Sequence, residues 1–150
     1  MSRLTQTAKC PRYLLVVLFL PIFCATLFSQ RRGNFDASAP RPIAAFDSVW
    51  IEELTWMEVR DAIKSGKTTA IIPAGSTEQN GPYVASGKHV YVLRATSEAI
   101  ARKLGNALIA PTVPFEPGNF STVPGTIQVR QETFDAFVED EARSLKANGF

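Results

Sequence analysis

The side chains best suited to chemistry lie in one polar stretch, residues 75–83, which reads GSTEQNGPY. Within it, Glu78 offers a hard carboxylate, and His89, the single histidine of the chain, follows shortly after. A carboxylate and an imidazole together suit zinc, manganese or iron. The stretch comes directly after a run expected to form a buried strand, and α/β proteins bind ligands where such strands end. These residues therefore predict a metal site formed by Glu78 and His89.

The same two residues also have a simpler interpretation. Glu78 would be an acidic residue of a surface loop, and His89 would be a helix N-cap or a solvated side chain. Spacing alone leaves both interpretations open. A thiolate site is excluded after residue 30, because both cysteines, Cys10 and Cys24, precede it.

The elements that must position these residues alternate between helix and strand. Thr55 and Glu58 form a capping box that predicts a helix ended by Gly66. The β-branched run 68–73 predicts a strand covered on both faces. We then expect, in order, a polar loop over 74–88, a helix over 89–104, a strand over 107–110, a Pro/Gly-rich loop over 111–125, a brief extended piece over 126–129 and a helix over 132–147.

Each predicted helix has an apolar face that should point to the core. These faces comprise Leu54, Val59 and Ile63; then Val90, Leu93, Ile100 and Leu104; then Phe134, Phe137, Val138 and Leu145. Of the third helix, Phe134 and Phe137 are expected in the core, and the acidic run 139–141 on a solvated face.

This alternation predicts the α/β class, as a three-layer sandwich with a mostly parallel sheet. Only two clear strands occur in the roughly 100 residues after the linker, which is a thin core by the usual burial scaling. A truncated chain is therefore expected. The predicted boundaries are a signal peptide at 1–29, a linker at 30–49 and the domain at 50–150.

The first 29 residues indicate export. Arg3, Lys9 and Arg12 precede an uncharged apolar run at 13–28, shorter than the ~20 residues of a membrane span. This pattern predicts a secretory signal cleaved near Ser29. The alternative is an uncleaved anchor. The protein is then periplasmic or secreted in either case.

The charge balance excludes one class of partner. The chain has 16 basic and 14 acidic residues. Three of the basic residues and none of the acidic ones lie before residue 30, so 13 basic and 14 acidic residues remain after it. No basic surface for nucleic acid is therefore expected.

Two motifs give the chain a family resemblance. Residues 75–82, GSTEQNGP, and residues 123–127, VPGTI, resemble the GSxEQHGP and FPGTI segments of the creatininase family. The resemblance covers about residues 54–150. It implies metal-dependent hydrolysis of a C–N bond in a small amide substrate, a homo-oligomer when full length, and two metal ions near the strand ends.

The resemblance also locates the departures from the family pattern. The family's first ligand matches Glu78, its second, a histidine, matches Asn80, and its third, a bridging aspartate, matches His89. The remaining ligands would lie beyond Phe150. Because an imidazole normally binds one ion where a carboxylate can bridge two, we expect one ion, zinc or manganese with iron as a further candidate, held by Glu78 and His89. Asn80 and Tyr83 are candidates for metal or substrate contact, with packing an equal alternative for Tyr83.

The expected activity is hydrolysis by a metal-activated water, with no residue assignable as general base. The alternatives are an exported non-catalytic binding protein on the same fold and an inactive truncated fragment.

Overall fold

The computed structural model describes residues 36–150, and these fall into two compact units divided between Pro40 and Arg41. The predicted signal peptide, residues 1–29, lies outside the described residues. Residues 41–49, which the sequence suggested as linker, belong to the larger unit, Arg41–Phe150. Within the described residues, no helix is both long and apolar enough to cross a membrane.

The first helix, α3 (Trp56–Lys64), begins at the predicted capping box. The Thr55 hydroxyl accepts a hydrogen bond from the Glu58 backbone N–H, and the Glu58 carboxylate accepts one from the Thr55 backbone N–H at 2.8 Å. Glu58 is buried and also accepts from the Phe46 backbone N–H at 2.5 Å. These hydrogen bonds, that from Phe46 first, lower the pKa of Glu58. One carboxylate thus caps the helix and holds the segment before it.

The sheet at the centre is short and parallel. Strand β1 (Thr69–Ile71) pairs in parallel with β2 (Ala107–Ile109), with Ala70 opposite Leu108. All of β2 is buried, whereas β1 is exposed at Thr69 and half-buried beyond it. The strand expected to be covered on both faces is thus only partly buried, because among the described residues β1 pairs with β2 alone and is an edge strand.

Trp50 extends this sheet on the other side of β2. It forms a parallel bridge with Ile109, whose N–H donates to the Val49 carbonyl at 2.8 Å. The short 3-10 helix η2 (Ile51–Glu53) follows at once. Val49, Trp50, Ala101, Ala107 and Ile109 form the buried core, with Ile71 packed against it.

Helix α4 (Lys88–Leu104) packs on β2 through small residues. Ser97 and Ala101 are its buried positions, and Gly105 ends it in the left-handed conformation. Ile100 and Leu104, predicted to face the core, are 52% and 55% exposed. That prediction is wrong because the buried stripe of α4 runs through Ser97 and Ala101, four residues apart, and Ile100 and Leu104 lie beside this stripe.

Strands β3 (Glu116–Pro117) and β4 (Gln128–Val129) form a second parallel pair, which leads into α5 (Gln131–Asn148). No residue of α5 is buried, and Phe137 is 56% exposed. The prediction of Phe134 and Phe137 as core residues is therefore wrong, since Phe134 is only half-buried. The acidic run also differs from expectation at Glu141, which is half-buried and whose pKa is raised by desolvation.

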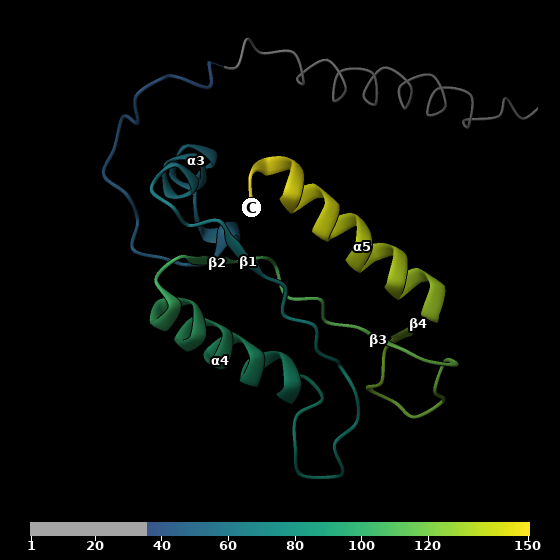
Figure 1. The fold of residues 1–150 in the computed structure, drawn as a ribbon. Helices are drawn as coiled ribbons and strands as arrows, with labels where there is room; N and C mark the ends of the chain where they lie inside the picture. The colour runs from purple at the N-terminus through teal and green to yellow at the C-terminus, as the bar shows by residue number, and fades with distance from the viewer. Residues whose placement is uncertain (1–35) are drawn as a thin grey trace, which may run out of the picture. The chain divides into compact units, whose positions relative to one another are not determined.

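Figure 1 shows α4 on one side of β1 and β2, and α3 and α5 on the other. This helix–sheet–helix order, with parallel strands, confirms the predicted α/β three-layer architecture. The loop between β1 and α4 and the segments around β3 and β4 extend beyond the ends of the central strands.

Candidate functional site

The loop that carries Glu78 leaves the carboxyl end of β1 and returns at the start of α4. Beyond β1, an isolated parallel bridge joins Ala74 to Val113, and the Gly75 N–H donates to the Val113 carbonyl at 2.9 Å. A Cβ at Gly75 would lie 2.7 Å from Leu93 Cδ1. Glycine therefore lets the loop pass close to α4 just before Glu78.

The two sequence motifs meet in space. Thr77 and Ile127 form an antiparallel bridge, and the Ile127 N–H donates to the Thr77 carbonyl at 2.9 Å. The Gln79 N–H donates to the Thr126 hydroxyl at 3.1 Å. Gly125 has a φ of +86°, which a residue with a side chain rarely adopts. The GTI segment thus supports both flanks of Glu78.

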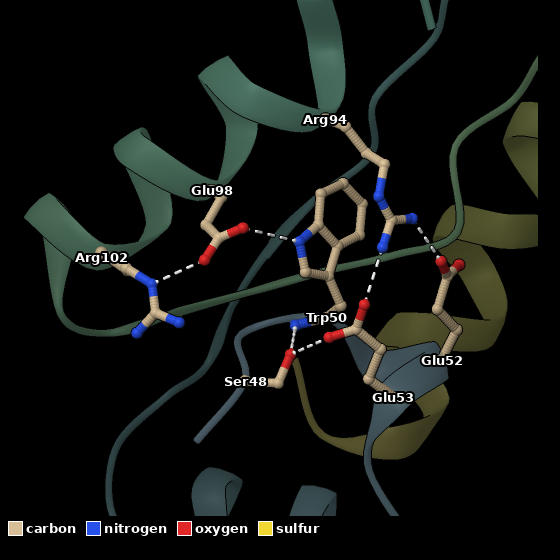
Figure 2. A network of polar contacts seen from close by, with 7 residues as sticks. All are labelled: Ser48, Trp50, Glu52, Glu53, Arg94, Glu98 and Arg102. Atoms are coloured by element: carbon tan, nitrogen blue, oxygen red, sulfur yellow. Dashed lines mark hydrogen bonds and ion pairs between the residues drawn. The ribbon is translucent and has the colours of Figure 1, made fainter. Parts of the chain in front are cut away.

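A polar network joins helix α4 to Trp50 and to the residues that follow it (Figure 2). The Arg94 guanidinium lies 4.5 Å from the centroid of the Trp50 ring and donates to Glu52 and Glu53 at 2.8 and 2.7 Å. The hydrogen bond to Glu52, first among several causes, raises the pKa of Arg94. Arg94 therefore ties α4 to η2 and to the central sheet.

A second contact in the same network lies further along α4. The Trp50 indole N–H donates to Glu98 at 3.4 Å, and Arg102 donates to the other oxygen of Glu98 at 2.8 Å. The bond from Arg102, and then that from Trp50, lowers the pKa of Glu98. These contacts hold the helix whose first turn contains His89.

Glu78 and His89 come together at this place. The His89 Nε2 atom lies 2.8 Å from Glu78 Oε1, and their side chains are 39% and 29% exposed. Glu78 is further held through its backbone N–H, which donates to the Ser86 carbonyl at 3.0 Å. A carboxylate and an imidazole in direct contact and open to solvent can share a proton or a cation.

The other two candidate residues lie differently. The Asn80 side-chain amide donates to the Glu78 carbonyl at 2.9 Å, so its nitrogen is used within the loop. Tyr83 is 96% exposed. Within the described residues, Tyr83 therefore neither packs in the core nor lines the pocket beside His89.

The geometry can be compared with what a bound ion needs. Zinc binds nitrogen and oxygen at about 2.0–2.2 Å in tetrahedral geometry, which separates two ligand atoms by about 3.4 Å. Glu78 and His89 would have to part by about 0.6 Å to reach that separation, and their partial exposure permits this. Across residues 36–150, no three His, Cys, Asp or Glu side chains gather as one metal-binding group. The pair thus fits as part of a ligand set.

A pocket of about 430 Å³ opens beside His89. Its polar side chains are Ser76, His89 and Glu116, and Leu93 and Phe134 contribute apolar walls. Sequence reasoning missed Glu116, which lies in the region predicted as a Pro/Gly-rich loop. The available signal was a lone acidic residue between Phe115 and Pro117, which has no recognisable motif.

Taken together, the fold and site define an α/β protein in which polar side chains gather beyond the ends of parallel strands. The sequence model of the family described as "Creatininase: Creatinine amidohydrolase" matches residues 52–150. The chain belongs to this family.

Two relatives of known function are similar to the chain. Creatinine amidohydrolase of Pseudomonas putida is 28% identical over 108 residues, which covers 68% of this chain and 41% of the relative. The 3-dehydro-scyllo-inosose hydrolase of Thermotoga maritima is 30% identical over 103 residues, which covers 68% of this chain and 33% of the relative. The chain thus spans less than half the length of either hydrolase.

Solved structures agree with this assignment. A crystal structure of creatinine amidohydrolase superposes with a TM-score of 0.64 at 26% identity, covering 69% of this chain and 42% of that one. Similar structures with the same TM-score include a mutant creatininase of "Zn-Zn type" at 26% identity and "Creatininase Mn" at 27%, with the same coverage. Divalent metals therefore occur in structures of this family.

Proposed function

We propose that this protein is a metal-dependent hydrolase of the creatininase type, which cleaves a C–N bond in a small amide or cyclic amide. The observation that carries the proposal is the 2.8 Å contact between Glu78 and His89 beyond the end of β1. Family membership supports hydrolase chemistry, since both relatives of known function are hydrolases. Zinc or manganese is the proposed ion, with iron as a further candidate.

Glu78 and His89 would hold this ion through Oε1 and Nε2. A bound divalent ion would supply water ionised near neutral pH and polarisation of the substrate carbonyl. Catalytic zinc sites commonly use three protein ligands, and the described part of the chain brings together these two. The role of the chain's own residues is therefore to place a carboxylate and an imidazole at the mouth of the pocket that includes Ser76 and Glu116.

A single ion fits these residues better than two. The position of the family's bridging aspartate holds His89, whose imidazole nitrogen can bind one ion only. The position of its second ligand holds Asn80, whose neutral amide oxygen is a poor substitute for an imidazole on a transition metal, and whose amide nitrogen donates to the Glu78 carbonyl at 2.9 Å. We therefore propose a mononuclear site.

Metal titration of the purified protein tests this proposal. Wild type should bind zinc or manganese, and His89→Ala and Glu78→Gln should each weaken binding by tenfold or more, since loss of supporting groups alone costs metal sites that much. Glu132→Gln, at an exposed position of α5, is the matched control and should bind as wild type does. Unchanged zinc affinity and stoichiometry in His89→Ala would refute the proposal.

The alternative is a non-catalytic binding protein on the same fold. The hydrogen bond from Asn80 to the Glu78 carbonyl favours this alternative, because the side chain at the family's second ligand position is held within the loop without a metal ion. In that case the protein would bind small amides equally well with and without added zinc. A hydrolysis assay with zinc present separates the two functions, since only the enzyme releases product.

Export is a separate proposal and depends on residues 1–29. Amino-terminal sequencing of the protein recovered from the cell envelope and the medium would test it. A mature amino terminus near Gln30 supports a cleaved signal, and an intact amino terminus in the membrane fraction supports an anchor. Intact protein in the cytoplasm would contradict both.

A further inference from the structure

The pocket beside His89 contains a carboxylate that the proposed metal chemistry does not use. Glu116 lines this pocket from β3, together with Ser76 and His89. Among residues 36–150, Glu116 is not part of any group of three potential metal ligands. It therefore faces the same space as His89 without belonging to the Glu78–His89 pair.

Gln128 holds Glu116 in one orientation. The two residues are register partners in the β3–β4 pair, and the Gln128 Nε2 atom donates to Glu116 Oε1 at 2.9 Å. The Gln128 Oε1 atom accepts from the Ser121 backbone N–H at 2.8 Å. Because one end of the amide must accept from a backbone N–H and the other must donate to a carboxylate, its orientation is fixed.

Gly118 makes room for this arrangement. A Cβ at Gly118 would lie 2.4 Å from both the Cδ and the Nε2 atoms of Gln128. An alanine there would push the amide away from its present position, although the backbone of Gly118 does not have a positive φ. The site thus combines a glycine, an oriented amide and a carboxylate.

The chemistry of this wall follows from its charge. A carboxylate only accepts hydrogen bonds. Among residues 36–150 the Gln128 amide donates to Oε1 of Glu116, which leaves Oε2 for a ligand. A ligand group facing Glu116 must therefore donate, as an amino or amidino N–H does. A carbonyl oxygen in the same place would meet the carboxylate with no shared proton.

We propose that Glu116 is a specificity-determining residue, which selects small substrates that present an N–H donor to the pocket wall formed by β3. This inference rests on the proposed function for the identity of the pocket as the substrate site. It adds a residue and a direction of recognition that family membership does not assign.

The test is the binding of two ring compounds of the same shape by calorimetry. Creatinine bears an amino group where 1-methylhydantoin, called hydantoin below, bears a carbonyl oxygen. Wild type should bind creatinine more tightly than hydantoin. Glu116→Gln puts an amide N–H donor where the carboxylate has the acceptor Oε2. Creatinine affinity should then fall about tenfold or more, as for the loss of a hydrogen bond to a charged group. The preference for creatinine over hydantoin should shrink or reverse.

A second variant guards against a folding defect in the first. Gly118→Ala retains Glu116 but displaces Gln128, and should also weaken creatinine binding, with hydantoin binding unchanged. Glu132→Gln is again the control. Circular dichroism and thermal unfolding check that each variant is folded.

The results separate this inference from the proposed function. An unchanged creatinine-to-hydantoin ratio in folded Glu116→Gln would overturn the inference, and zinc binding that still depends on His89 would leave the proposed function standing. If the creatinine-to-hydantoin affinity ratio changes as expected in Glu116→Gln but zinc binding does not depend on His89, the proposed metal site is refuted and the role of Glu116 in specificity is supported. Failure of wild type to bind either compound would also overturn the inference.

Discussion

Arg94 offers the sharpest test of how the fold positions the site. Its guanidinium makes ion pairs with Glu52 and Glu53 and lies over the Trp50 ring. Exposed ion pairs contribute about 0.2–1 kcal/mol each, and an exposed cation–π contact about 0.5–1 kcal/mol. Since the Arg94 side chain is 45% exposed, solvent screening places the total near the lower part of that sum. We expect Arg94→Met to cost about 1–2 kcal/mol.

Urea unfolding followed by tryptophan fluorescence measures this cost, because Trp50 lies under Arg94. At an m-value of about 2 kcal/mol/M the midpoint should fall by about 0.5–1 M. Arg94→Lys keeps the charge but not the planar fork, so its loss should be intermediate.

The matched control is Arg143→Met on α5. Among residues 36–150, Arg143 pairs only with Glu139, one helical turn away, and the two side chains are 73% and 61% exposed. Such an exposed pair contributes about 0.3–0.5 kcal/mol. Should Arg94→Met destabilise the protein no more than Arg143→Met does, the network would not be what fixes α4, and the reasoning would be refuted.

Four further predictions concern single positions. Thr55→Ala removes the N-cap of α3 and should cost about 1 kcal/mol in thermal unfolding. The pKa of Glu58 is lower in the folded chain than its usual 4.5. The stability that ionised Glu58 contributes is therefore full above pH 4.5 and is lost as the pH falls through the lowered pKa. Glu58→Gln should make the free energy of unfolding depend less on pH in this acid range, and an unchanged dependence would contradict the prediction. Gly125→Ala places a Cβ at a φ of +86° and 2.8 Å from the Ser86 hydroxyl, and should lower stability by about 1 kcal/mol or more. Burial raises the pKa of Glu141, so Glu141→Met should raise the melting temperature at pH 7 and change it less at pH 4.

The sequence predicted the elements well where the signal is local. The capping box at Thr55 and Glu58 begins α3 as expected. The helix predicted over 89–104 forms as Lys88–Leu104, and the strand over 107–110 as Ala107–Ile109. Caps, stop glycines and β-branched runs act within a few residues, so one sequence is enough to find them.

Contacts between distant residues were not predictable in the same way. The stacking of Arg94 on Trp50 joins positions far apart in the chain, and no periodicity reports such a pair. Helix faces failed for a related reason. Hydropathy predicts Ile100 and Phe137 as core residues, but the buried positions of α4 are Ser97 and Ala101, and α5 buries no residue in the described part of the chain.

The site was predicted in part. The residue types of Glu78 and His89 predict a shared site, and the structure brings the two side chains into contact, whereas the metal itself stays a prediction. Glu116 could not be found from sequence, because its importance depends on Gln128, its register partner in the β3–β4 pair. A lone carboxylate becomes informative only when its partner is known.

One short segment links the two parts of the site. The Ile127 N–H donates to the Thr77 carbonyl, next to Glu78, while the side chain of the following residue, Gln128, holds Glu116. Neighbouring residues of an extended segment point to opposite sides, so this segment can support the Glu78–His89 pair through its backbone and the pocket wall through a side chain. A change that moves the whole segment, such as Gly125→Ala, should therefore disturb zinc and creatinine binding together. A change at Glu116 alone should disturb only the second, because the Thr77–Ile127 contact does not pass through its side chain.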